Sequence, residues 1–262
     1  MRAIPMVLGS LLFGTAALAQ PVPSAEQKAQ LAPSGALRAA IVTIPFLAKQ
    51  DAGGQTKGVA PDLAAELSRA LGVPYEPTAF QAPNAGIAAL RDGKADITFL
   101  APTPGRIALI DFAPAFMEME ITLIVPGDSP IKTLADADQT GRRIVVYEKT
   151  ANEETARKAL TKATIVHVPL FAYKKAFDMI KAGEADAFVD LRDQLASHQA
   201  NFPGSRLVPG ALGRNAMAIG YVKERPAAAA YVKSFTEAMV NSGFVTRAIE
   251  RAGVRGASAP GT

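Results

Sequence analysis

Short runs of β-branched and apolar residues alternate with amphipathic helical segments along this chain, and this alternation restricts its possible folds most. The clearest helical segment begins at Pro61 and ends before Gly72. Its apolar positions, Leu63, Leu67 and Leu71, recur every four residues and form one face. The expected strands are 37–43, 75–80, 96–100, 120–125, 144–147, 164–168, 186–189, 206–208 and 216–222. Strands that alternate with helices predict an α/β fold with parallel sheets.

The alternation falls into two series. The first precedes the long β-branched run at 120–125, and the second follows it. A strand at 216–222 then leads into two helices at 226–240 and 244–252. One strand leaving the first series and another returning to it are the pattern of a two-lobed protein whose chain crosses twice between its lobes.

The N-terminus has the pattern of a secretory signal peptide. Arg2 provides a positive start, an apolar run follows, and Ala17-Leu18-Ala19 offers small residues for cleavage. We therefore expect residues 1–19 to be removed and the protein to be exported to the periplasm; a buried N-terminal helix is the alternative. By composition, 20–35 is expected to be a flexible lead-in and 256–262 a disordered tail.

The composition argues against several classes of function. The chain has no cysteine, so neither a disulfide nor a thiolate metal site is possible. Its two histidines, His167 and His198, have no acidic residue at metal-ligand spacing. The formal net charge of +4 arises from scattered charges and indicates no surface for nucleic acid. No phosphate-binding loop, dinucleotide fingerprint or nucleophile elbow occurs. We expect a monomer without cofactor, metal or nucleic-acid partner, and no enzymatic activity.

Four segments carry a resemblance to a known family. They are GVAPDLAAELSRALG from residue 58, LRDGKADITFL from residue 90, TPGRIALIDFAPAF from residue 103 and AGEADAF from residue 182. In this order and spacing they resemble the family 3 solute-binding proteins of ABC importers. The resemblance covers most of residues 37–255. It includes Pro45-Phe46 after the first strand, where the family often has the same pair.

The resemblance implies a type II periplasmic-binding-protein fold, with two α/β lobes, paired hinge strands and a ligand cleft between the lobes. The first lobe is expected at 36–124 and the second at 125–213, with a return to the first lobe at 214–255. The hinge is expected to include 121–125 and 216–221. Such proteins close around their ligand by rotation about the hinge.

Arg106 is the first candidate for ligand binding. In the family, the arginine of this loop binds the ligand's carboxylate, and a guanidinium suits a planar anion because it forms two parallel charge-assisted bonds. The alternatives are a surface arginine and an ion pair with Asp111. Thr103 is expected to share the anion, to cap a helix, or both. Ala101, which we also place in the site, and Pro102 stand where the family often has a serine or threonine, which leaves fewer side-chain donors.

Thr150 and Ala151 open the first helix of the expected second lobe. The family commonly has Gly-Thr-Thr there, so Thr150 matches and Lys149 replaces the glycine. A helix N-terminus presents unpaired amides and a partial positive charge, which suit a carboxylate. An ordinary N-cap is the alternative interpretation of Thr150.

Asp190 is the candidate for the ammonium group of an amino acid. It lies four residues after Asp186, where the family usually has five, and a shift of one residue turns a side chain to the other face of a strand. Either a local bulge corrects the shift, or Leu191 faces the pocket and Arg192 becomes a candidate for a second anion contact. Phe46 is expected to stack on the apolar part of the ligand or to belong to the core.

Together these residues predict a periplasmic protein that captures a small carboxylate-bearing solute, an amino acid or a relative, and delivers it to a membrane ABC permease. One alternative is an enzyme on the same scaffold, similar to cyclohexadienyl dehydratases. The other is a sensor that passes the ligand signal to a membrane receptor.

Overall fold

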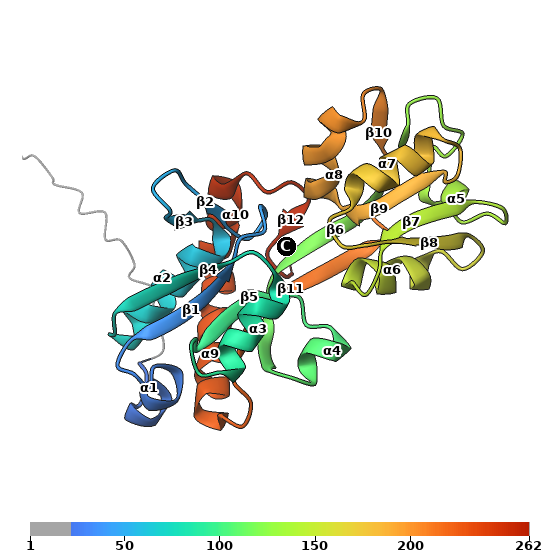
Figure 1. Cartoon of the computed structure of the whole chain (residues 1–262). Coiled ribbons are helices and arrows are strands. Elements are labelled where there is room, and N and C mark those ends of the chain that lie inside the picture. Colours follow the sequence, from blue (N-terminus) through green and yellow to red (C-terminus); the bar gives the residue numbers. More distant parts are fainter. Residues whose placement is uncertain (1–21, 262) are drawn as a thin grey trace, which may run out of the picture.

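The chain folds into two α/β lobes joined by two long strands (Figure 1). The computed structural model describes residues 22–261, so the expected signal peptide at 1–19 lies outside the described residues. The joining strands are β6 (Asp111–Pro126) and β11 (Gly213–Tyr221). They connect the two halves of one sheet of order β4-β1-β5-β11-β6-β9-β7-β8, so the predicted two-lobed α/β fold is confirmed.

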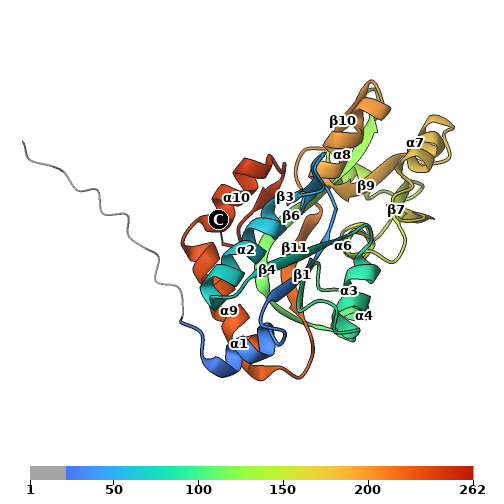
Figure 2. The same ribbon diagram turned by 60° about the vertical axis from the view of Figure 1, so that its left-hand side comes forward.

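The first lobe is built on a parallel arrangement of β4, β1 and β5. Its strands are β1 (Leu37–Val42), β4 (Tyr75–Phe80) and β5 (Ile97–Leu100). Its main helices are α2 (Val59–Leu71), α3 (Pro83–Arg91), α9 (Pro226–Asn241) and α10 (Phe244–Ala252). Alternate residues of β1 pack into different clusters, Leu37 and Ile41 with α2, and Ala40 and Val42 with α3. Helices therefore cover both faces of this sheet, as Figure 2 shows, and a strand buried on both faces needs a continuous apolar run.

The second lobe repeats this arrangement. Its parallel strands are β7 (Arg143–Tyr147), β8 (Thr164–Val168) and β9 (Ala187–Leu191). Its main helices are α6 (Ala151–Ala159), α7 (Tyr173–Lys181) and α8 (Arg192–His198). Further short elements are β2 (Lys49–Gln50), β3 (Thr56–Lys57), α4 (Pro104–Ile107), α5 (Leu134–Ala137), η1 (Gln199–Asn201) and β10 (Ser205–Leu207). No helix of residues 22–261 is long and apolar enough to cross a membrane.

An arginine–aspartate clamp stabilises the sheet in both lobes. In the first lobe, the Asp96 carboxylate accepts bonds from the amide and the guanidinium of Arg38, at 2.9 and 2.7 Å. In the second, Asp186 accepts from the amide of Arg143 at 2.8 Å. Each aspartate follows a helix–glycine turn, and each clamp fixes the start of one strand beside its neighbour. The clamps therefore set the register that brings the ends of the parallel strands to the cleft.

The crossing between the lobes lies earlier in β6 than the sequence indicated. Residues 121–124 of β6 already pair with β9 of the second lobe, whereas 111–115 pair with the part of β11 that pairs with β5. The expected boundary at 124/125 and the hinge at 121–125 are thus too late in the chain. The register between β6 and β11 shifts on either side of Ala218, and such irregularities bend a strand pair.

Both ends of the described chain are more ordered than the composition indicated. Within the expected flexible lead-in, α1 (Ala25–Leu31) begins with a capping box in which Ser24 and Gln27 each accept the other's amide. Gln30 accepts the amide of Ala228 at 2.9 Å, which attaches α1 to α9. Within the expected disordered tail, β12 (Ala257–Ser258) pairs with β6. The lead-in and tail predictions are therefore wrong for these segments.

Candidate functional site

A cleft of about 620 Å³ lies between the lobes. The loops that follow β1, β4 and β5 line one side, and the loops that follow β7, β8 and β9 line the other. Ligands of open α/β sheets bind at the carboxyl ends of parallel strands, because there the loops and helix N-termini converge. Both lobes present this end of their sheet to the same cleft.

Arg106 is a half-buried cation in the wall of the first lobe. It lies in the one-turn helix α4, and its Nη1 donates to the carbonyl of Ala101 at 2.9 Å. It forms no ion pair with a carboxylate of residues 22–261, and burial lowers the pKa of its guanidinium. The alternative ion pair between Arg106 and Asp111 does not form. The Asp111 carboxylate instead lies 3.8 Å from the ammonium group of Lys223. Arg106 is therefore a partly desolvated cation that lines the cleft, and most of its N–H donors remain available to a ligand.

Thr103 and Ala101 support Arg106 through their backbones. Thr103 is the N-cap residue of α4, but its side chain makes no capping bond. Unlike Ala101 and Arg106, Thr103 is not among the described residues that line the cleft. The hydroxyl contact expected from Thr103 therefore has no support in this geometry, whereas Ala101 both lines the cleft and orients the guanidinium.

Thr150 and Ala151 line the opposite side of the cleft, at the N-terminus of α6. The Thr150 hydroxyl accepts the amide of Glu153 at 3.2 Å and donates to the carbonyl of Tyr147 at 2.9 Å. The N-cap interpretation is correct, and the hydroxyl proton is already used within the protein. The groups of α6 that remain available to a ligand are the backbone amides of its first turn, including that of Ala151.

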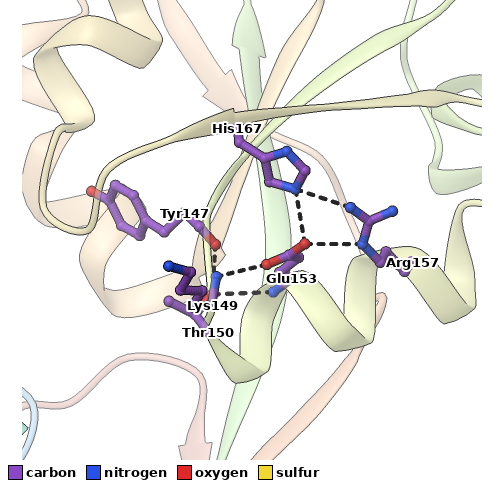
Figure 3. Close-up of polar contacts among 6 residues, drawn as sticks. All are labelled: Tyr147, Lys149, Thr150, Glu153, Arg157 and His167. Carbon is purple, nitrogen blue, oxygen red and sulfur yellow. Dashed lines mark hydrogen bonds and ion pairs between the residues drawn. The ribbon is translucent and has the colours of Figure 1, made fainter.

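Glu153 holds this helix start in place (Figure 3). Its carboxylate accepts the amide of Lys149 at 2.7 Å and the guanidinium of Arg157 at 2.9 Å, and it lies 2.8 Å from Nε2 of His167. Burial raises the pKa of Glu153, but these hydrogen bonds outweigh it and the net shift is downward. Lys149 has a positive φ of 58°, which is uncommon for residues other than glycine, and the bond to Glu153 stabilises it.

Asp190 lies in the cleft wall of the second lobe, at the end of β9. Its Oδ1 accepts the side-chain amide of Asn152 at 2.6 Å and the backbone amide of Leu191 at 2.8 Å. Burial raises the pKa of the carboxyl to about 7, although both hydrogen bonds oppose the shift. The register of β9 with β6 is continuous, so the bulge considered from the sequence is absent from this pairing. Asp190 and Leu191 nevertheless both line the cleft.

Arg192 does not provide a second anion contact. Its Nε donates to Glu120 at 2.6 Å, and its Nη2 donates to the carbonyl of Gly210 at 2.6 Å. Glu120 also pairs with Arg214 at 3.7 Å. Arg192 therefore belongs to a charged network beside the crossing strands, and it is not among the described residues that line the cleft.

A chain of side-chain amides connects Asp190 to the crossing strand β11. Asn215 of β11 donates to Asn152, which in turn donates to Asp190, and Thr155 donates to Asn215 at 3.3 Å. Helix α6 approaches β11 closely, since a Cβ on Gly213 would lie 2.7 Å from the Thr155 methyl group. The carboxylate of Asp190 is thus oriented by a fully bonded polar chain that reaches the crossing.

The remaining cleft wall is rich in aromatic rings. Phe46 lines the cleft from the first lobe and is only 6% exposed, so it serves both core and cleft. In the second lobe, the rings of Tyr173 and His198 are stacked with centroids 3.8 Å apart and an angle of 7° between planes. Leu170 and Phe171 also line this side.

The family model described as bacterial extracellular solute-binding proteins, family 3, matches residues 38–253. The chain is a family 3 solute-binding protein. No curated protein matches it significantly by sequence.

Solved structures of similar fold are amino-acid-binding proteins. The ancestral amino acid-binding protein AncCDT-1, a precursor of cyclohexadienyl dehydratase, is 26% identical with a TM-score of 0.64, and the match covers 86% of this chain and 97% of that one. The solute receptor for L-cysteine of Neisseria gonorrhoeae is 23% identical with a TM-score of 0.65, covering 87% and 95%. A substrate-binding protein of a Streptococcus pneumoniae amino acid ABC transporter, bound to L-arginine, is 21% identical with a TM-score of 0.64, covering 86% and 97%. The last two show likeness of fold alone.

Several cleft residues of this family 3 protein escaped the sequence analysis. Asn152 and Asn215 are 63 residues apart and meet only because α6 packs against β11. No local motif marks such a pair. The residues after β8 carried a signal that could have been used, because Leu170 and Phe171 are large apolar residues in a segment between a strand and a helix, where polar residues are usual.

Proposed function

We propose that this family 3 protein binds a small carboxylate-bearing solute, an amino acid or a close relative, between its lobes. The observation that carries the proposal is the Arg106 guanidinium, which is half-buried in the cleft wall without a carboxylate partner among residues 22–261. A ligand carboxylate supplies that partner, and the fork of the guanidinium accommodates both of its oxygens.

The opposite wall supports an amino acid in particular. Asp190 has no cationic partner among the described residues, and because burial raises the pKa of its carboxyl to about 7, about half of it is protonated at neutral pH. An α-ammonium group of the ligand provides the positive charge that Asp190 lacks. Amides at the start of α6 add donors for the ligand's carboxylate. A zwitterion that contacts Arg106 from one lobe and Asp190 from the other stabilises the closed arrangement of the lobes.

The family supports a proposal about the cellular role. We propose that the protein acts in the periplasm and passes its ligand to a membrane ABC permease. The signal-peptide pattern of residues 1–19 and the extracellular description of the family support this role. A sensor would use the same cleft, and uptake of labelled ligand by vesicles containing the permease, with and without the protein, distinguishes the two roles.

Calorimetric titration with the standard amino acids tests the binding proposal. For the amino acid that binds best, Arg106→Ala is expected to weaken binding roughly 100-fold or more, because two charge-assisted hydrogen bonds are lost. Arg106→Lys should recover only part of this loss, since a lysine cannot bind both oxygens in one plane. Arg91→Ala, at an exposed arginine outside the cleft, serves as the control. Equal affinity of the wild type and Arg106→Ala would contradict the proposal.

A second candidate function rests on Asp190. A carboxyl group with a pKa of about 7 in a cleft is able to donate a proton to a leaving group. The similarity to a precursor of cyclohexadienyl dehydratase suggests that the reaction would be a dehydration of this kind. Turnover of prephenate or arogenate by the wild type, abolished in Asp190→Asn, would support an enzyme. We expect no turnover.

A further inference from the structure

The loop between β8 and α7 places two large apolar side chains at the cleft without burying them. The exposed large hydrophobic residues of the described chain are Val22, Ile107, Leu109, Leu170 and Phe171. Only Leu170 and Phe171 line the cleft, and they are 44% and 53% exposed. Apolar surface that stays exposed beside a ligand cleft favours a ligand able to cover it.

Phe171 also has an unfavourable backbone conformation. The amide of Ala172 donates to the carbonyl of Pro169 at 3.0 Å, which closes a four-residue turn, and Phe171 is its third residue with a φ of 67°. Glycine or asparagine is usual at a position of this kind, because a bulky side chain is strained there. The phenylalanine gives the turn no advantage in stability, so its role lies in what its ring contacts.

The wall behind this loop is aromatic and uncharged. Tyr173 and His198 form a flat stacked pair, and Tyr173 also meets Phe177 of the second core cluster edge-on, with centroids 5.9 Å apart. Burial lowers the pKa of His198, which keeps its ring neutral at neutral pH. Apart from Asp190, the only acidic residue among the described cleft residues is Glu148, which is exposed. Besides Asp190, the described cleft residues therefore offer no second buried carboxylate for a cationic side chain.

We propose that Leu170, Phe171, Tyr173 and His198 form a subsite for a large apolar or aromatic side chain, so that the ligand is an amino acid such as phenylalanine or leucine. The inference rests on the proposed function, since Arg106 and Asp190 orient the ligand's backbone groups. Closure of the lobes covers Leu170 and Phe171 with the ligand's side chain, and Phe46 faces it from the first lobe.

Titration with L-phenylalanine, L-leucine, L-serine and L-arginine tests the substrate class. Phenylalanine or leucine is expected to bind at least tenfold more tightly than serine and arginine. If serine or arginine binds as tightly as both apolar amino acids, the subsite is wrong while the proposed function stands. If no amino acid binds, or if Arg106→Ala binds equally well, the proposed function fails and the subsite fails with it.

Substitutions in the loop separate a ligand contact from a structural role. Phe171→Gly relieves the backbone strain, so its melting temperature should not fall, but its affinity for the apolar ligand should drop about tenfold. Leu170→Ala should weaken binding several-fold, whereas Leu109→Ala, with a side chain of similar exposure outside the cleft, should not. Unchanged affinity in Phe171→Gly would overturn the subsite. This holds even if uptake through the permease falls, because the loop would then act in delivery and not in ligand binding.

Discussion

At the scale of single residues, two charged groups of the cleft, Arg106 and Asp190, share one property: each is shifted toward its neutral form. Burial lowers the pKa of Arg106 and raises that of Asp190. Neither forms an ion pair within residues 22–261, so neither shift is compensated by an opposite charge. A zwitterionic ligand provides a counter-ion to both at once, which links affinity to the protonation of Asp190.

Affinity for an amino acid should therefore depend on pH. Below pH 7 the Asp190 carboxyl holds a proton that must leave before it can accept an ammonium group. Affinity is expected to fall about tenfold for each unit below pH 7 and to level off above it. Calorimetry in two buffers of different ionisation enthalpy measures the proton release directly. Asp190→Asn should bind more weakly without this pH dependence, and exposed Asp178→Asn should behave as the wild type.

The same shift affects stability without ligand. The unfolded chain loses this proton near pH 4, whereas the folded protein keeps it until about pH 7. The folded state thus binds the extra proton between these values, and its stability should decrease as pH rises through this window. Asp190→Asn should remove this component. Urea unfolding at pH 5 and pH 8 measures it, and an equal pH dependence in both proteins would contradict the assignment.

The position of Arg106 was more predictable from the sequence than the positions of the other site candidates. Arg106 lines the cleft as expected because its motif is local and the one-turn helix α4 places it directly; its contact with a ligand stays a prediction. The Thr103 hydroxyl was assigned wrongly because the direction of a side chain at a helix start depends on surrounding packing. Asn152 and Asn215 were missed because their contact depends on how two distant elements pack.

At the scale of elements, the start of α6 is the part of the cleft most dependent on a single side chain. Glu153 binds the amide of Lys149 and is itself held by Arg157 and His167 (Figure 3). Without it, the positive φ of Lys149 has no compensating bond, and the amides that face the cleft lose their fixed direction.

Glu153→Ala should therefore reduce both stability and affinity. We expect a loss of about 1–2 kcal/mol in the free energy of unfolding, from the lost hydrogen bonds at the helix start. Ligand affinity should fall several-fold. Glu154→Ala is a matched control, because Glu154 lies in the same first turn but is exposed. Chemical denaturation and calorimetry measure the two effects, and equal behaviour of the two variants would refute this role for Glu153.

Most elements were predictable from the sequence because they depend on local periodicity. The helix at α2 and the buried strands β1, β5 and β7 follow directly from their apolar patterns. Helix α1 was missed although Ser24 and Gln27 have capping-box spacing, because the proline-rich composition was given more weight. Strand β12 has only two residues and exists through its pairing with β6, which no local pattern indicates.

At the scale of the whole molecule, the sheet of residues 22–261 passes from one lobe to the other through β6 and β11, and β12 pairs with β6 at the crossing. Strand β6 continues for 16 residues from one lobe into the other without interruption of the strand. This continuity explains why the expected boundary at 124/125 was displaced. Residues 117–120 of β6 lie between the part of the strand that pairs with 218–221 of β11 and the part that pairs with β9. We propose that the lobes rotate about this segment.

The central claim is that the lobes close on a ligand bound by Arg106, and a distance between the lobes tests it most directly. The chain has no cysteine, so Ala88→Cys on α3 and Lys175→Cys on α7 allow specific spin labelling at exposed positions outside the cleft lining. We expect the distance between the labels to shift to one shorter value at a saturating concentration of the best-binding amino acid. The same protein with Arg106→Ala should show no shift at that concentration. An unchanged distance in the presence of bound ligand, or an equal shift without Arg106, would contradict the claim.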